Sequence, residues 1–177
     1  MQEHNVRLKN TTRKVMPGIL LALILLFSLT ACSEKSSASN DADPNAEQQR
    51  TISTVSEDSG LVIPVGDITE KAAFYPVDVD GTKMEVIAVK APDGTIRTAF
   101  NTCQVCYDSG RGYYVQSGDK LVCQNCGNQF SMDRVEVEAG GCNPYPIFKE
   151  NKTVTDDSIT ISYDFLKESK DIFANWK

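Results

Sequence analysis

The sequence predicts a mostly β fold, a small domain of antiparallel hairpins closed by one short C-terminal helix. Three observations support this. Runs of β-branched and aromatic residues between positions 72 and 123 are separated by Asp-Gly, Gly-Asp or Pro-Asp-Gly turns. Apolar and polar residues alternate in "SITISYDF" (158–165), and two Cys-x-x-Cys motifs follow predicted strands. Period-two alternation between turn residues is typical of strands that are buried on one face.

The first predicted strands form consecutive hairpins. "AAFYPVDV" (72–79) and "KMEVIAVK" (83–90) are separated by Asp80-Gly81, and "TIRTAF" (95–100) follows Pro92-Asp93-Gly94. Asp-Gly favours the tight turns that join antiparallel strands. Pro76 lies inside the first run, which predicts an edge strand or a bulge there because proline has no N–H to donate.

The remaining elements complete the expected domain. "GYYVQ" (112–116) and "KLVC" (120–123) flank Gly118-Asp119 and predict a hairpin, and 158–165 predicts a closing strand. The tail 165–176 has apolar residues spaced loosely as in a short helix.

The N-terminus predicts export from the cytoplasm. Four basic residues precede an apolar run of 11 residues, from Ile19 to Leu29, which ends in Leu29-Thr30-Ala31-Cys32. A basic segment, a short apolar run and small residues indicate a secretory signal. The last four residues resemble a bacterial lipobox, which implies cleavage before Cys32 and a lipid, such as palmitate, on its sulfur. We expect a protein anchored by lipid to the extracytoplasmic face of a bacterial membrane.

Charge and histidine content exclude several classes of function. Residues 32–177 keep 14 of the 18 Lys and Arg residues and 23 of the 24 Asp and Glu residues, a formal net charge of −9. This chain lacks the basic clusters that nucleic-acid binding requires. The only histidine, His4, lies in the predicted signal, so no imidazole remains for general base catalysis or metal ligation. The missing imidazole excludes most hydrolase mechanisms.

Composition also predicts the domain boundaries. Residues 1–31 are the expected signal peptide, and 32–59 are the lipidated cysteine with a flexible tether, since 33–50 are small and polar without apolar periodicity. Residues 60–177 then form one domain of ordinary size.

The cysteines predict a metal site. Their spacing is C-x2-C-x16-C-x2-C, formed by Cys103, Cys106, Cys123 and Cys126. A hairpin between two Cys-x-x-Cys turns brings four thiolates together, and four sulfurs suit zinc or an iron–sulfur cluster. Gly127 after the second pair allows a positive φ that turns backbone N–H groups toward the sulfurs, whereas Tyr107 occupies this position in the first loop.

Two other uses of the cysteines remain open. An exported protein usually forms disulfides, but five cysteines besides Cys32 cannot pair completely. A disulfide within Cys-x-x-Cys closes a small loop and stabilises little. A thiol-exchange protein of the thioredoxin kind would place its Cys-x-x-Cys at the start of a helix, and both motifs here follow strands.

The sequence resembles two known families around these cysteines. "CQNCGNQF" (123–130) is similar to the second box of Rieske proteins, with cysteine in place of histidine. The stretches "AAFYPVDVDG", "DGTIRTAFNTCQVCY", "KLVCQNCGNQF" and "GGCNPYPI" resemble the FtrD-like membrane-associated iron–sulfur proteins over most of residues 70–148. By position, Cys103 and Cys123 match the Rieske cysteines. Cys106 and Cys126 match the Rieske histidines, with one extra residue in the first loop.

The FtrD-like resemblance implies a Rieske-like β fold and an iron–sulfur cluster, with [2Fe–2S] favoured, in a membrane redox or ferrous-iron uptake system. The resemblance therefore favours an electron-transfer protein over a true enzyme. A membrane redox or transport protein would then be the partner, besides the membrane itself. One alternative is a zinc-binding structural domain that serves as an interaction module, because the spacing suits zinc equally well. Another is a surface iron-binding donor or thiol redox protein.

A fifth cysteine, Cys142, follows Gly140-Gly141 and precedes Pro144 and Pro146. Flexible glycines and then stiff prolines predict a rigid lid over the site, as a proline loop covers the cluster in Rieske proteins. We expect Cys142 to be an additional ligand or, preferably, a thiol beside four primary ligands; the alternatives are a disulfide partner or a buried cysteine that only packs.

The tyrosines and acidic residues carry weaker expectations. Tyr75, Tyr113, Tyr114 and Tyr145 are expected to pack rather than to react. The pair Glu136 and Glu138 is expected on a solvated face, and Trp176 is expected to pack at the C-terminus.

Overall fold

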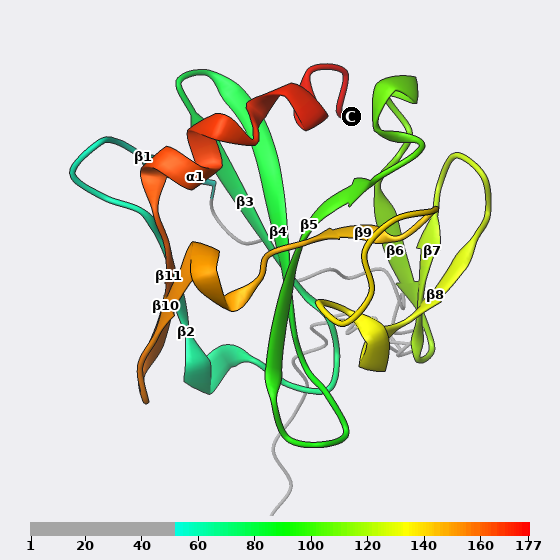
Figure 1. The fold of residues 1–177 in the computed structure, drawn as a ribbon, viewed down its shortest axis with the longest axis horizontal. Helices are drawn as coiled ribbons and strands as arrows, with labels where there is room; N and C mark the ends of the chain where they lie inside the picture. The colour runs from blue at the N-terminus through cyan, green and yellow to red at the C-terminus, as the bar shows by residue number, and fades with distance from the viewer. Residues whose placement is uncertain (1–51) are drawn as a thin grey trace, which may run out of the picture. The chain divides into compact units, whose positions relative to one another are not determined.

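A five-stranded sheet lies at the centre of the computed structural model, which describes residues 52–177 (Figure 1). Its order is β1-β3-β4-β5-β9, and all neighbours are antiparallel except β1 and β3, which are parallel. The strands are β1 (Ser53–Val55), β3 (Ala73–Val79), β4 (Thr82–Lys90), β5 (Ile96–Cys103) and β9 (Pro144–Pro146). The prediction of a mostly β, largely antiparallel fold is confirmed.

The turns between β3, β4 and β5 follow from the residues that form them. Asp80 and Gly81 both have positive φ, 50° and 82°, as a two-residue hairpin turn requires. The Asp78 carboxylate accepts a hydrogen bond from the Gly81 N–H at 2.8 Å. Gly94 has φ 81° in the next turn. Strand β3 lies between β1 and β4, so the edge strand or bulge predicted from Pro76 is wrong; Pro76 is tolerated one residue outside the part of β3 that pairs with β1.

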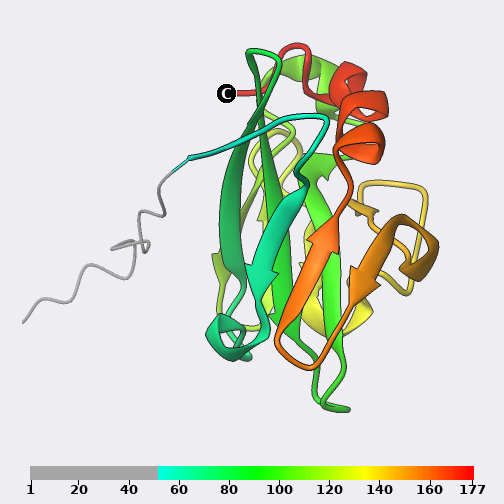
Figure 2. The ribbon, with the colours of Figure 1, turned by 90° about the vertical axis from the view of Figure 1, so that its left-hand side faces the viewer.

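A second sheet, β10-β11-β2, covers one side of the central sheet; Figure 2 shows its three strands side by side. The strands are β2 (Leu61–Pro64), β10 (Lys152–Val154) and β11 (Ser158–Ile161). The predicted strand 158–165 is wrong in its second half. The Ser162 hydroxyl accepts a hydrogen bond from the Phe165 N–H and caps helix α1 (Tyr163–Glu168), so the chain turns helical after Ile161.

The third sheet, β6-β7-β8, carries the second cysteine loop and lies on the other side of the central strands in Figure 1. Its strands are β6 (Tyr114–Ser117), β7 (Lys120–Cys123) and β8 (Gln129–Ser131). The predicted hairpin around Gly118-Asp119 is present, with Ser117 opposite Lys120. Helix α1 is the only α-helix of residues 52–177; five short 3-10 helices are η1 (Val65–Asp67), η2 (Tyr107–Ser109), η3 (Met132–Arg134), η4 (Lys149–Asn151) and η5 (Lys170–Phe173).

Strand β4 is buried on both faces because the central sheet is covered on both sides. Met84 and Val86 pack in a core with β2, β11 and α1, whereas Ile87 and Val89 pack in a second core with the cysteines. Since residues alternate between the faces of a strand, a strand covered on both faces reads as a nearly continuous apolar run. "MEVIAV" (84–89) is such a run, so the cysteines lie against a rigid, buried strand.

The central sheet begins before residue 60, the predicted start of the domain. Strand β1 pairs with β3, and Val55 is buried. Thus residues 53–55 of the predicted tether are part of the sheet. The predicted signal peptide, Cys32 and the tether up to residue 51 lie outside the residues that the structure describes.

Candidate metal centre

Four of the five cysteines in residues 52–177 come from two strand ends. Cys103 is the last residue of β5, and Cys123 is the last residue of β7. Cys106 and Cys126 follow in the turns after these strands, and Cys142 lies in the loop that leads into β9. Segments far apart in the sequence therefore deliver their thiols to one end of the fold.

The first cysteine loop is held by its own turn and by Gly112. The Cys106 carbonyl oxygen accepts from the Ser109 N–H at 3.0 Å and from the Ser109 hydroxyl at 2.7 Å. Gly112 packs directly on this turn: a Cβ added to it would lie 2.5 Å from the Cys106 carbonyl oxygen. The Gly112 carbonyl oxygen in turn accepts from the Cys103 N–H at 2.6 Å. Gly112 is thus a residue of the site that sequence reasoning missed.

The second cysteine loop has the expected glycine conformation. Gly127 has φ 73° and its N–H donates to the Cys123 carbonyl oxygen at 2.9 Å. The Cys123 N–H donates to the Asn128 carbonyl oxygen at 2.9 Å. These bonds close a tight turn in which the amide groups of Asn125 and Cys126 reach the Cys123 sulfur.

The lid loop, residues 139–143, is hydrogen-bonded to the first cysteine loop through Gln104. The Gln104 side chain accepts from the Gly140 N–H at 2.9 Å and donates to the Pro144 carbonyl oxygen at 3.3 Å. Its backbone N–H donates to the Asn143 carbonyl oxygen at 3.1 Å. Gly140 and Gly141 have positive φ, 88° and 65°. The loop therefore approaches the site in a fixed conformation, which glycine permits without strain.

A second set of bonds ties the lid loop to the other cysteine loop. The Cys142 carbonyl oxygen accepts from the Asn128 side-chain amide at 2.8 Å and from the Tyr114 hydroxyl at 2.8 Å. Tyr114 is fully buried beneath the cysteines. The position of Cys142 is thus determined from both cysteine loops.

The five sulfurs form two overlapping groups. The sulfurs of Cys103, Cys106 and Cys123 all lie within 4.8 Å of one another. A second group with the same limit consists of Cys106, Cys126 and Cys142. The first group is buried, whereas Cys126 is exposed and Cys142 is partly exposed. No disulfide joins the five cysteines of the described residues.

Hydrogen bonds lower the pKa of two of these thiols. Burial raises the pKa of Cys103, but bonds from the Tyr114 hydroxyl and from the Val105 and Cys106 amides outweigh burial, so its pKa lies below the usual value. The Asn128 amide is the main cause of a lowered pKa at Cys126.

The pKa of the other three thiols is raised. Burial raises the pKa of Cys123 to about 12, and the hydrogen bond to Cys126, with burial, raises the pKa of Cys142 to about 12. The pKa of Cys106 is also raised: the Asn125 side chain lowers it, but burial and the neighbouring Cys126 and Cys103 sulfurs outweigh this bond. Five thiols this close cannot all ionise without a compensating cation, and thiolates are the form that binds soft metals.

A buried polar network supports the site from below. The Asn101 side chain accepts from the Tyr114 N–H at 2.7 Å and donates to the Tyr114 carbonyl oxygen at 3.3 Å. It also donates to the Glu85 carboxylate, which Lys177 approaches at 3.3 Å. The Asn101 side chain therefore links β5 to β6 through two hydrogen bonds to the Tyr114 backbone. Trp176 donates to the Asn101 carbonyl oxygen at 2.7 Å, so the C-terminus packs here, as expected.

The role of Tyr114 could have been found from the sequence. Counting back from the Gly118-Asp119 turn places Tyr114 opposite Cys123, and the structure has this pairing. A tyrosine opposite a predicted ligand cysteine is within reach of the group of cysteine sulfurs. We expected only packing from this residue, whereas its hydroxyl donates to the Cys142 carbonyl oxygen of the lid loop.

Glu136 differs from the solvated residue that was expected. Its carboxylate pairs with the Lys152 amine and accepts from the Thr98 N–H at 2.8 Å. The Lys152 side chain is only 3% exposed. The Glu136 side chain is therefore only 16% exposed, because its carboxylate is directed at Lys152 and at the backbone of β5.

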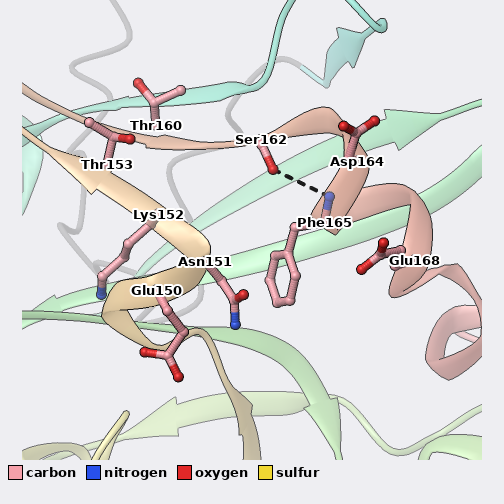
Figure 3. Close-up of a pocket in the computed structure, with 9 residues that line it drawn as sticks. All are labelled: Glu150, Asn151, Lys152, Thr153, Thr160, Ser162, Asp164, Phe165 and Glu168. Carbon is pink, nitrogen blue, oxygen red and sulfur yellow. Dashed lines mark hydrogen bonds between the residues drawn. The ribbon is translucent and has the colours of Figure 1, made fainter.

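A separate hollow lies between β10, β11 and the start of α1 (Figure 3). It contains the carboxylates of Glu150, Asp164 and Glu168 but no cysteine. The hydrogen bond drawn there is the Ser162 cap of α1. Since its polar groups serve the helix start and the surface, we place the candidate site at the cysteines.

Comparison with known proteins agrees with this site. The chain matches the model of a family described as membrane iron–sulfur containing protein FtrD-like over residues 68–173, which include all five described cysteines. No curated protein and no solved structure matches the chain. Within residues 52–177, none of the helices has the length and apolar character needed to span a membrane.

Proposed function

Since the chain belongs to the FtrD-like family of membrane iron–sulfur proteins, we propose that it transfers electrons through an iron–sulfur cluster at the extracytoplasmic membrane surface. The proposed ligands are the four thiolates of the two cysteine loops: Cys103, Cys106, Cys123 and Cys126. A [2Fe–2S] cluster is favoured. The proposed partner is a membrane redox protein or an iron-uptake system.

One observation carries the proposal. Two loops from separate strands and a third loop converge on five sulfurs, and no other group of Cys, His, Asp or Glu in residues 52–177 could hold a metal ion. A set of cysteine thiolates with backbone amides directed at the sulfurs fits an iron–sulfur cluster, whose potential depends on such hydrogen bonds. The donor set therefore suits the cofactor that the family name implies.

The residues around the sulfurs have separate tasks. When bound, the cluster supplies a one-electron couple, while the protein holds, orients and shields it. Burial of Cys103 and Cys123 excludes water from the inner side, and the exposed Cys126 leaves an outer side that a partner can approach. The Tyr114 hydroxyl and the loop amides stabilise negative charge on sulfur.

The lid loop is proposed to protect this outer side. Cys142 lies next to the Cys106 and Cys126 sulfurs, and its loop is held by Gln104, Asn128 and Tyr114. Cys142→Ala should retain the cluster but change its potential or its sensitivity to oxygen. Complete loss of the cluster in this variant would make Cys142 a primary ligand.

The membrane attachment is proposed from the N-terminal sequence. The lipobox-like Leu29-Thr30-Ala31-Cys32 and the tether would place the domain outside the cytoplasm. Mass spectrometry of the N-terminal peptide from membranes tests this proposal: it should begin at Cys32 with attached lipid. A peptide that begins before residue 32 and carries no lipid would contradict it.

An absorption spectrum of anaerobically purified protein tests the cofactor. An iron–sulfur cluster gives visible charge-transfer bands, whereas a zinc site gives none, so a colourless protein with one tightly bound zinc would favour the structural alternative. Two Cys-x-x-Cys disulfides with no metal would contradict both.

The reduction potential tests the ligand set. Clusters with four cysteines of the plant type lie near about −400 mV, and Rieske clusters with two histidines lie between roughly −150 and +300 mV. The acidic domain favours the more positive, oxidised cluster, so we expect a potential clearly below the Rieske range. A positive potential would contradict all-cysteine ligation.

A further inference from the structure

The sulfurs are not arranged as in a single four-cysteine site. The four cysteines of the two loops do not form a single close group; instead Cys106 belongs to two groups of three, and Cys142 completes the outer one. Sulfurs bound to one zinc ion at about 2.3 Å lie about 3.8 Å apart. Each group, with sulfurs at most 4.8 Å apart, is therefore close to the geometry of a bound ion.

Hydrogen bonds hold the outer group in place. The Cys142 carbonyl oxygen accepts two side-chain hydrogen bonds at 2.8 Å, and Gln104 bonds Gly140 and Asn143 in the lid loop and Pro144 directly after it. The backbone N–H of Asn128 reaches the Cys126 sulfur, while its side-chain amide bonds the Cys142 carbonyl oxygen. Asn128 thus orients both outer thiols that the inner group does not use.

The donor set allows two ions. Each group offers three sulfurs within 4.8 Å of one another, and these bind as thiolates once a metal ion displaces their protons. Thiolates select soft ions such as zinc over calcium or magnesium, and a thiolate can bridge two ions if its sulfur contacts both.

We propose that the cluster-free chain binds two thiophilic divalent ions of the zinc class, bridged by the Cys106 sulfur. The inner ion is held by Cys103, Cys106 and Cys123, and the outer ion by Cys106, Cys126 and Cys142. The inference rests on the cysteine site of the proposed function but not on the nature of its cofactor. It assigns Cys142 a ligand role in the metal-loaded, cluster-free state.

The two ions differ in access to solvent. The inner sulfurs are buried, with Cys103 0% and Cys123 1% exposed, whereas the outer ion is bound next to the exposed Cys126. An ion with three protein ligands has a fourth position for water or an incoming ligand. The outer ion is therefore the one that exchanges with a competing chelator first.

Cadmium titration of the full-length chain tests the proposal. The reduced, cluster-free protein with Cys32→Ser is titrated with Cd²⁺ without oxygen, while the cadmium–thiolate absorption and native mass are followed. Two ions per chain are expected. Cys142→Ser, introduced into this Cys32→Ser chain, should lose the outer ion and retain one. The chain with Cys32 intact and lipidated is the matched control for the Cys32→Ser change and should retain two.

Bridging is tested separately by ¹¹³Cd magnetic resonance. Two resonances with coupling between them are expected, because one sulfur connects both ions. Saturation at one ion, two ions in Cys142→Ser, or two uncoupled resonances would overturn the proposal. The wild-type measurements do not depend on how a variant folds, and the fluorescence of the single tryptophan, Trp176, checks each variant.

Failure of this inference is distinguishable from failure of the proposed function. A chain that forms an iron–sulfur cluster but binds one cadmium ion overturns only the two-ion site. A chain that binds two cadmium ions but never yields a coloured cluster overturns only the proposed function.

Discussion

Gly112→Ala should disrupt the first cysteine loop although it adds a single methyl group. The new Cβ would lie 2.5 Å from the Cys106 carbonyl oxygen, 2.6 Å from its carbonyl carbon and 2.9 Å from the Tyr107 nitrogen. All three are backbone atoms, so no side chain can move aside. To lengthen the closest contact from 2.5 Å to 3.4 Å, where ordinary van der Waals contacts begin, the turn must shift by about 0.9 Å.

The expected effect has two parts. Overpacking of this kind costs about 1–3 kcal/mol, and weakening the bond from the Cys103 N–H to the Gly112 carbonyl oxygen adds about 1 kcal/mol. Displacement of Cys106 should also weaken metal binding by about 10–100-fold, as is usual when the surroundings of ligands change.

Urea denaturation of the metal-free protein, followed by the fluorescence of Trp176, measures the first part, and competition with a cadmium chelator measures the second. Gly66→Ala is the matched control, because an added Cβ meets no atom within 4 Å there and its φ is not positive. If both variants had the same stability and the same cadmium affinity, Gly112 would not be tightly packed on the cysteine loop, and the reasoning would be refuted.

Three further predictions concern other parts of the domain. Lys152→Met should lower the free energy of unfolding, measured by urea denaturation, by about 3–5 kcal/mol, because it leaves the Glu136 carboxylate unpaired and largely buried. Lys120→Met, at an exposed pair, should lower it by less than about 1 kcal/mol. Equal losses in the two variants would contradict this prediction. Tyr114→Phe should lower the reduction potential of a bound cluster, measured by electrochemical titration, because it removes the hydroxyl that lowers the pKa of Cys103; an unchanged or higher potential would show that this hydroxyl does not stabilise negative charge on the sulfur. Hydrogen bonds from Thr95 lower the pKa of Asp93 from 3.8 to about 2, so Asp93→Asn should destabilise the protein at neutral pH, and the difference from wild type should disappear as the pH falls from 3.8 through about 2. A difference that persists below pH 2 in acid denaturation would show that the carboxylate charge is not its cause.

The residues at the turns made most strands between positions 72 and 123 predictable from the sequence. Asp80-Gly81 needs positive φ at both residues, and Gly127 needs it after Cys126; the structure has both. These are local requirements, met by residues next to one another in the chain. The strand pairings that follow from them, such as β3 with β4, were therefore predicted.

The strand and helix of the C-terminal region were less predictable. The alternation of 158–165 continues through Tyr163 and Phe165, but the Ser162 cap converts these residues to helix. Both side chains still face the main core. A short apolar stretch can bury the same residues as a strand or as a helix, and here a single side-chain hydrogen bond decides between them.

The sequence by itself determined that two pairs of cysteines lie on turns at strand ends and that a fifth follows a glycine pair. Only the tertiary structure decided that Cys106 belongs to two groups of sulfurs and that Cys142 completes the outer one. It also decided that Gln104 and Asn128, separated by 24 positions in the chain, hold the same lid loop. Residues joined by a tight turn are placed by local backbone preferences, whereas the lid loop is placed by packing and hydrogen bonds across two sheets, for which no local pattern in the sequence codes.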